Sequence, residues 1–133
     1  MSNMMKLWAV VLLFGTMLFG VELHWEADTA TASAKAKVEN KQVMPIVEAS
    51  RCRWCKKMKE ETLADEEVNE RLQRYLLVKV ARCDKEEMNV LPESYYPAPS
   101  TFFITPDGEM IERAIGFLEA EECIASLNDV EAN

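Results

Sequence analysis

The chain has 133 residues, with 15 Lys or Arg against 23 Asp or Glu, and a formal net charge of −8. This length has room for one domain, and the acidic balance argues against nucleic acid as a partner. One stretch departs from that balance, because residues 51–59 carry five cations and no acid.

The N-terminal residues 1–22 have the pattern of an export signal or a membrane anchor. A short basic start precedes an apolar run over residues 7–21. This run is shorter than the roughly 20 residues that span a bilayer, and it fits the apolar region of a signal peptide. No clear cleavage site follows, so a soluble protein and one tethered to the inner membrane by residues 7–21 both remain open. We expect a periplasmic or other extracytoplasmic location.

Residues 23–40 are polar and rich in Ala, Thr and Lys, and we expect them to form a tether. The predicted folded domain is then 41–130. Its first apolar stretch, 43–49, has the length and composition of a strand. Residues 56–63 show helical spacing, and Asp65 is suited to cap a further helix over 66–74.

The apolar stretch 75–81 predicts a buried parallel strand, which completes a βαβ unit. A short helix is expected near 86–90. Residues 100–105 form the next predicted strand, and the Pro-Asp-Gly turn after it returns the chain antiparallel over 110–115. A last helix is expected over 119–128. This order predicts an α/β fold with a mixed central sheet and helices on both faces.

Cys52 and Cys55 have the C-x-x-C spacing that places the first thiol at a helix N-terminus. The helix dipole there favours the thiolate, which is the form that attacks disulfides. We predict a redox-active pair that needs no cofactor. The alternatives are an inert local disulfide or half of a metal site. No metal site is expected, because a zinc site would normally need a second such pair or paired histidines, and the only histidine is His24.

The stretches 52–63 and 98–108, together with the pair 116–117, resemble the thioredoxin superfamily over residues 41–130. They are similar to exported bacterial thioredoxin-like proteins related to SoxW and to the C-terminal domain of DsbD. The resemblance implies a thioredoxin-like fold.

The resemblance also implies roles for individual residues. Cys52 would be the nucleophile and Cys55 the resolving cysteine. Pro99 would be the cis-proline beside the active site, with Pro97 as the competing candidate, and Ala98 would offer backbone groups to a substrate strand.

Three departures from the family leave the redox potential open. Arg53 and Trp54 stand between the cysteines, where cytosolic thioredoxins have Gly-Pro. Ile46 stands where thioredoxins carry a buried aspartate, and the helix proline after the motif is absent.

Deprotonation of Cys55 requires a proton acceptor. Glu48 is the nearest candidate, because it lies on the same strand face as Ile46. Glu60 is a second candidate. The alternative is that Glu48 simply lies near the surface where the strand ends.

The cations beside the motif also allow two interpretations. Arg51, Arg53 and Lys56 either favour the thiolate of Cys52 or form an exposed cluster that aids solubility or docking to an acidic partner. Trp54 either contacts a partner protein or packs back on the edge of the sheet.

The remaining cysteines are Cys83 and Cys123. Cys83 is expected at the same sheet edge as the motif, as a structural or free thiol or a third redox thiol. Cys123 is expected to be buried.

The sequence predicts a monomeric, exported thiol–disulfide oxidoreductase. The resemblance to the reducing members of the exported group implies that it reduces disulfides of substrate proteins, with electrons from a membrane donor of the DsbD or CcdA kind. The alternatives are a periplasmic oxidase or isomerase, and a non-enzymatic metal-binding module.

Overall fold

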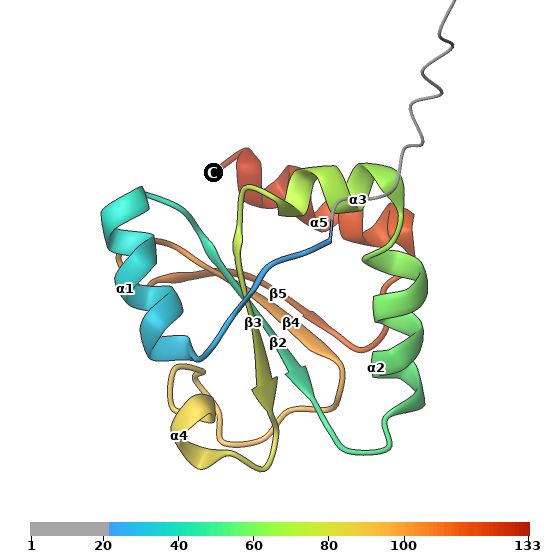
Figure 1. Ribbon diagram of the computed structural model, residues 1–133, viewed down its shortest axis with the longest axis horizontal. Coiled ribbons are helices and arrows are strands. Elements are labelled where there is room, and N and C mark those ends of the chain that lie inside the picture. Colours follow the sequence, from blue (N-terminus) through green and yellow to red (C-terminus); the bar gives the residue numbers. More distant parts are fainter. Residues whose placement is uncertain (1–21) are drawn as a thin grey trace, which may run out of the picture.

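A computed structural model describes residues 22–133, so residues 1–21 of the predicted signal or anchor lie outside the described part. The described chain forms a central sheet with helices on both sides (Figure 1). The strands follow the spatial order β1-β3-β2-β4-β5. They are β1 (Trp25–Glu26), β2 (Val43–Glu48), β3 (Leu76–Ala81), β4 (Ser100–Ile104) and β5 (Met110–Ile115).

The sheet is mixed, as the sequence predicted. Strands β1, β3 and β2 run parallel, with Glu48 of β2 opposite Ala81 of β3 at their carboxyl ends. Strand β4 is antiparallel to β2, and β5 returns beside β4 as a hairpin. The α/β class with a mixed sheet is therefore confirmed.

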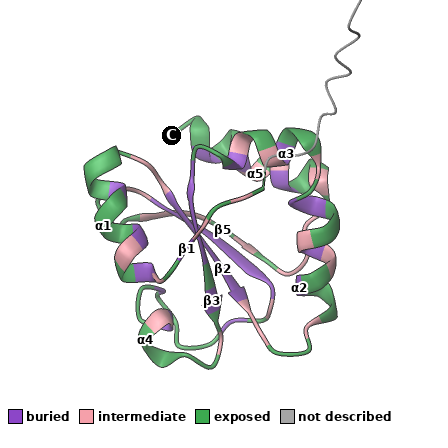
Figure 2. Ribbon diagram, in the orientation of Figure 1, coloured by how far each residue is buried: buried purple, intermediate pink, exposed green. Residues whose placement is uncertain are grey.

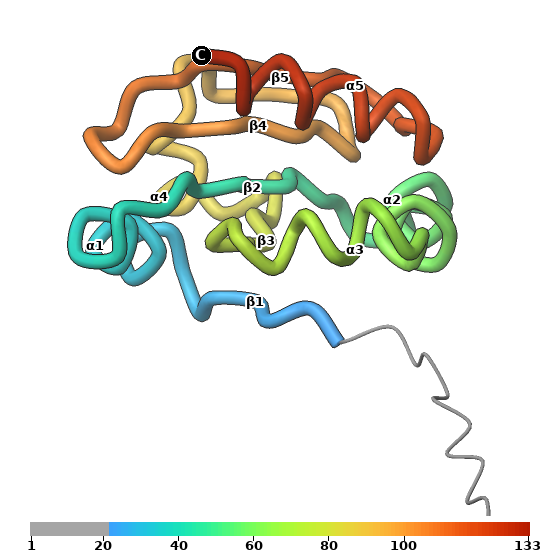
Figure 3. The backbone as a smooth tube through the Cα atoms, turned by 90° about the horizontal axis from the view of Figure 1, so that it is seen from above, coloured from blue at the N-terminus to red at the C-terminus, as the bar shows by residue number. Residues whose placement is uncertain are grey.

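Helices cover both faces of this sheet (Figure 3). One face carries α1 and α4, and the other carries α2, α3 and α5, with a π-helical segment, η1, directly after α2. Their bounds are α1 (Thr29–Glu39), α2 (Arg53–Lys57), η1 (Met58–Thr62), α3 (Glu66–Leu72), α4 (Lys85–Met88) and α5 (Ala120–Glu131). None of the helices within residues 22–133 is both long and apolar enough to cross a membrane.

The central strands are largely buried (Figure 2). Their side chains alternate between the two faces of the sheet, and one core cluster lies on each face. Val47 of β2 and Phe102 of β4 face the side of α1. Ile46 of β2 and Phe103 of β4 face the side of α2, α3 and α5. The strands are therefore apolar on both faces, and burial on each side anchors the helices that flank them.

Residues 23–40 are not a tether, and that sequence prediction is wrong. Asp28 caps α1 by accepting a hydrogen bond from the Thr31 N–H at 2.7 Å. Ala32 and Ala36, four residues apart, are fully buried in the core cluster on that face. Alanine favours helices and packs closely, so a segment without large apolar residues still covers the sheet. The folded part therefore begins well before residue 41.

The helix after the cysteines contains one irregular turn. The Leu63 N–H donates to the Met58 carbonyl five residues back, at 2.9 Å. This π-type bond turns both side chains to the core, where each is at most 3% exposed. Such insertions are frequent near functional sites, and this one lies one turn beyond Cys55.

Candidate active site

The C-x-x-C motif lies at the carboxyl edge of the sheet, where β2 ends and α2 begins (Figure 1). Arg51 adopts a left-handed backbone conformation with φ of 57°, which turns the chain sharply into the helix. Cys52 is the N-cap of α2, and Cys55 lies in its first turn. The two cysteines form a disulfide with their Cα atoms 5.2 Å apart.

The two sulfur atoms have unequal surroundings. Cys52 is partly exposed, whereas Cys55 is 4% exposed. The backbone N–H of Cys55 donates to the Sγ of Cys52 at 3.1 Å. A hydrogen bond to sulfur stabilises a thiolate more than a thiol. The geometry therefore suits Cys52 as the accessible sulfur.

A second segment of the chain meets the disulfide from the side of β4. The peptide bond between Ala98 and Pro99 is cis, Pro99 is buried and Pro97 is exposed. The Ala98 carbonyl oxygen lies 3.6 Å from the Cys52 Sγ. This is a contact and not a hydrogen bond, because a disulfide sulfur carries no proton.

The chain after β5 holds this segment in place. The Pro99 carbonyl accepts a hydrogen bond from the Gly116 N–H at 2.8 Å. Gly116 has φ of 94°, a conformation that side-chain-bearing residues rarely adopt. Nearby, the Thr62 hydroxyl in η1 donates to the Leu118 carbonyl. The end of β5 thus connects the Ala98–Pro99 turn to the helix that carries the cysteines.

Trp54 combines the two arrangements considered from the sequence. Its ring packs on Phe117 with centroids 5.5 Å apart, yet the residue remains 45% exposed. The Arg53 guanidinium lies 5.1 Å and the Lys57 ammonium 5.3 Å from the centre of the indole. These cation–π contacts fix an aromatic surface beside the disulfide.

Glu48 lies at the end of β2 and is paired with a lysine. Its Oε1 accepts from the Lys59 Nζ at 2.7 Å, and its side chain is 19% exposed. Glu48 also lines the same surface hollow as Cys52 and Cys55. Glu60 lines that hollow too, but it is exposed and its carboxylate lies 3.8 Å from the Lys56 ammonium. Of the two candidate proton acceptors, Glu48 is the more buried and the more firmly held.

The other cysteines are free and take no part in the motif. Cys83 follows β3 at the carboxyl edge and is exposed. Cys123 belongs to α5 and is buried in the core cluster on that face of the sheet, and burial raises the pKa of its thiol to about 11. Among residues 22–133 there is no group of three or more His, Cys, Asp and Glu side chains placed to hold a metal ion.

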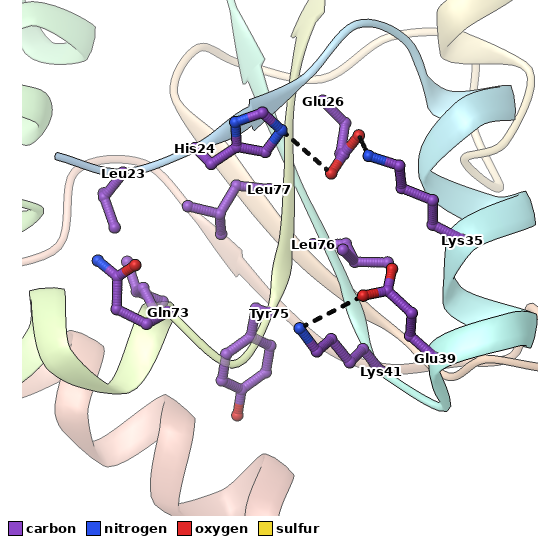
Figure 4. A pocket seen from close by; sticks show the side chains of 11 residues that line it. Leu23, His24, Glu26, Lys35, Glu39, Lys41, Gln73, Tyr75, Leu76 and Leu77 are labelled. Carbon is purple, nitrogen blue, oxygen red and sulfur yellow. Dashed lines mark hydrogen bonds and ion pairs between the residues drawn. The ribbon is translucent and has the colours of Figure 1, made fainter.

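A separate pocket lies at the opposite end of the sheet, where β3 begins (Figure 4). Its polar centre is Glu26, whose buried carboxylate accepts from Lys35 at 2.8 Å and lies 3.5 Å from His24. The hydrogen bond to Glu26 raises the pKa of Lys35. None of the motif residues lines this pocket, so its charges serve to hold β1 against α1.

Two residues of the site, Lys59 and Phe117, were not predicted from the sequence to belong to it. Lys59 was seen only as part of a basic stretch, although a lysine four residues after Cys55 lies on the helix face next to the end of β2. Phe117 was noted only for the family pattern, because its contact with Trp54 joins segments 63 residues apart. Only the three-dimensional packing reveals such a pair.

The sheet order, the C-x-x-C disulfide at the end of β2 and the cis-proline turn opposite it define a thioredoxin-like protein. The chain belongs to the thioredoxin-like domain family, whose model matches residues 29–131. Among curated protein sequences, none matches the chain.

Solved structures share the fold. A thioredoxin from Thermus thermophilus superposes with a TM-score of 0.68 at 23% identity, over 81% of this chain and 86% of that one. The oxidised C-terminal domain of DsbD from Neisseria meningitidis gives 0.62 at 26% identity, over 79% and 97%. A DsbH oxidoreductase gives 0.58 at 20% identity, over 85% of each chain. The resemblance to the thioredoxin superfamily is thus confirmed.

Proposed function

We propose that this protein is an exported thiol–disulfide oxidoreductase that reduces disulfides of substrate proteins through Cys52 and Cys55. The observation that carries the proposal is the asymmetry of the pair. Cys52 is partly exposed, and its Sγ accepts an N–H at 3.1 Å and lies beside the Ala98–Pro99 turn, whereas Cys55 is only 4% exposed. An inert structural disulfide has no need of this arrangement.

The first chemical step starts from the dithiol. The Cys52 thiolate attacks one sulfur of a substrate disulfide, so that a Cys52–substrate bond forms and the substrate S–S bond breaks. The second substrate sulfur leaves as a thiolate and takes up a proton. The Ala98 carbonyl, 3.6 Å from the Cys52 Sγ, lies where the backbone of the bound substrate would pass.

In the second step Cys55 resolves the mixed disulfide. Its thiol loses a proton, and the resulting thiolate attacks the Cys52 Sγ, which re-forms the protein disulfide and releases the other substrate thiolate. The substrate gains two electrons and the protein loses them. Glu48, which lines the hollow shared by both cysteines, is the proposed acceptor of the Cys55 proton, and Lys59 holds it in place.

The direction of electron flow and the cellular setting belong to the same proposal. The likeness to the DsbD C-terminal domain at 26% identity supports a reductive role outside the cytoplasm. A membrane electron donor of the DsbD or CcdA kind would regenerate the dithiol. The apolar run over residues 7–21 would export the protein or tether it, and the domain would act as a monomer.

A coupled assay tests the activity, and a redox titration tests its direction. The wild-type protein should accelerate the reduction of insulin by dithiothreitol, and Cys52→Ser should not. Equilibration with glutathione gives the reduction potential. A value near that of thioredoxin, about −270 mV, supports a reductase, whereas one well above the glutathione range supports an oxidase. No acceleration by the wild type would refute the oxidoreductase proposal.

A further inference from the structure

The surface around the active-site disulfide carries more positive than negative charge, although the chain as a whole has a net charge of −8. Glu48 and Glu60 line the hollow that holds the two cysteines, together with Arg51, Arg53, Lys56 and Lys59. A patch of four cations next to Cys52 in the chain is here called the basic rim. The basic rim consists of Arg51, Arg53, Lys56 and Lys57.

Partners within the protein do not neutralise the basic rim. Neither Arg51 nor Arg53 forms an ion pair with any residue of 22–133. Lys56 and Lys57 each reach one glutamate on the exposed helix surface, at 3.8 Å. Such exposed pairs contribute little free energy and are easily exchanged. Lys59 differs, because it is committed to Glu48 at 2.7 Å, and it is therefore not counted in the rim.

The aromatic residue of the motif holds the rim in position. Arg53 and Lys57 both lie within 5.3 Å of the Trp54 ring centre, and Lys57 lies 4.8 Å from that of Phe117. A further contact between a cation and an aromatic ring lies near the end of β2. The Arg82 N–H donates to the carbonyl at the end of β2, and its guanidinium stacks on the exposed Tyr95.

Screening makes this local excess matter more than the net charge. Charges more than about 8–10 Å away are largely screened at physiological salt, so the acidic residues on distant helices contribute little at the disulfide. A partner that brings its own disulfide to Cys52 must approach between these cations. Matching carboxylates would raise the encounter rate and exclude basic partners.

We infer that the redox partner is a polypeptide whose disulfide is flanked by acidic residues, which the basic rim recognises. This inference rests on the proposed function and names the class of its substrate. The rim selects among disulfides by charge, whereas the cysteines carry out the exchange. An anionic membrane is the less favoured occupant, because a bilayer pressed on the rim would cover Cys52.

Two model substrates test the inference. Each is a peptide with the same small disulfide ring, flanked by three glutamates in one and by three lysines in the other. Pre-reduced protein is mixed with each peptide, quenched by alkylation and analysed by mass spectrometry, so that no other reductant takes part. The measured quantity is the ratio of the two second-order rate constants. This ratio is insensitive to changes in the intrinsic reactivity of Cys52, which affect both peptides equally.

We expect the acidic peptide to react about tenfold faster at low salt, with the ratio falling towards one at high salt. The Arg51→Glu/Arg53→Glu variant should prefer the basic peptide. The matched control Lys37→Glu/Lys41→Glu changes the formal charge equally at the opposite end of the sheet, and it should keep the wild-type ratio.

Three outcomes overturn the inference. Equal rates for the two peptides, or a ratio that the rim variant leaves unchanged, overturn it while the oxidoreductase proposal stands. Reaction with neither peptide overturns both together. Flotation with vesicles of anionic lipid gives the third: binding by the wild type that the rim variant loses would assign the rim to a membrane.

Discussion

The carbonyl oxygen of Ala98 lies 3.6 Å from the Sγ of Cys52, although the two residues are 46 positions apart in the chain. The same sulfur also accepts a hydrogen bond from the Cys55 N–H at 3.1 Å. In the dithiol state the carbonyl would accept from a thiol, whereas the N–H would stabilise a thiolate. Two backbone groups, one in the first turn of α2 and one in the Ala98–Pro99 turn, therefore contact the same sulfur atom.

The unequal exposure of the two sulfurs predicts different covalent traps. Cys55→Ser should accumulate a stable mixed disulfide between Cys52 and substrate proteins, because the resolving thiol is gone. Non-reducing electrophoresis of a periplasmic extract should show these adducts, and dithiothreitol should release them. Cys52→Ser should form none, since Cys55 is only 4% exposed. Equal trapping by both variants would contradict the assignment of Cys52 as nucleophile.

Replacing Glu48 by Gln should slow the resolution of the mixed disulfide and leave its formation almost unchanged. The amide keeps the shape of the side chain but accepts a proton poorly, and general-base steps of this kind are worth about 10²-fold or more. Quenched-flow measurement of the two steps separates them. The matched control is Glu60→Gln, which alters an exposed carboxylate that lines the same hollow. Equal effects of the two variants would argue against Glu48 as the acceptor.

Local sequence patterns were sufficient for most of the fold. Alternating or continuous apolar runs located β2 to β5 to within one residue or so, and the C-x-x-C spacing located the start of α2. Asp65 caps α3 as predicted, with its carboxylate accepting from the Val68 N–H at 3.1 Å. Each of these features depends on residues close together in the chain.

The features that the sequence did not predict have a different physical origin. Helix α1 buries alanines, which have little apolar surface, so its amphipathic pattern is weak even though Ala32 and Ala36 are fully buried. The two-residue strand β1 is too short to show a pattern. The pairs Glu48–Lys59 and Trp54–Phe117 depend on how separate elements meet. Such contacts have no local sequence signature.

The packing of α1 predicts that a single charge on its inner face destabilises the domain. Ala36→Glu would place an unpaired carboxylate at a position that is 1% exposed, at a cost of about 3 kcal/mol. Val38→Glu is the control, because Val38 is 86% exposed on the same helix. Urea unfolding should show a lower midpoint for the first variant and no clear change for the second. Similar midpoints for the two variants would contradict the packing of α1 on the sheet and would support a tether over residues 23–40.

The free cysteines should differ in chemical reactivity. With the Cys52–Cys55 disulfide intact, native protein should react with a thiol reagent such as DTNB at one site, Cys83, which is exposed. Cys123 is fully buried and its pKa is raised to about 11, so it should react only after denaturation. Cys83→Ser should remove the native signal, and Cys123→Ala should remove only the second one. A fast second thiol in the native protein would contradict the packing under α5.

The burial of Cys123 also predicts a loss of stability at alkaline pH. Burial raises the pKa of this thiol from an ordinary value near 9 to about 11, so above pH 9 the unfolded chain releases a proton that the folded protein keeps. The contribution of this protonated thiol to the free energy of unfolding is complete below pH 9 and is lost as pH rises towards 11. It amounts to about 2–3 kcal/mol.

Burial and Glu131 raise the pKa of Tyr75 from about 10 to about 12, so Tyr75 adds a loss of stability that begins above pH 10 and is common to wild type and the Cys123 variant. Denaturant unfolding at pH 8 to 11 should therefore show a shallower decline in the free energy of unfolding for Cys123→Ala than for wild type. Because Cys123→Ala also leaves a small cavity, the comparison is between slopes and not between absolute stabilities. The control Cys83→Ala alters an exposed thiol, so its free energy of unfolding should decline with pH as steeply as that of wild type. An equally steep decline for Cys123→Ala would show that the buried thiol does not titrate in this range.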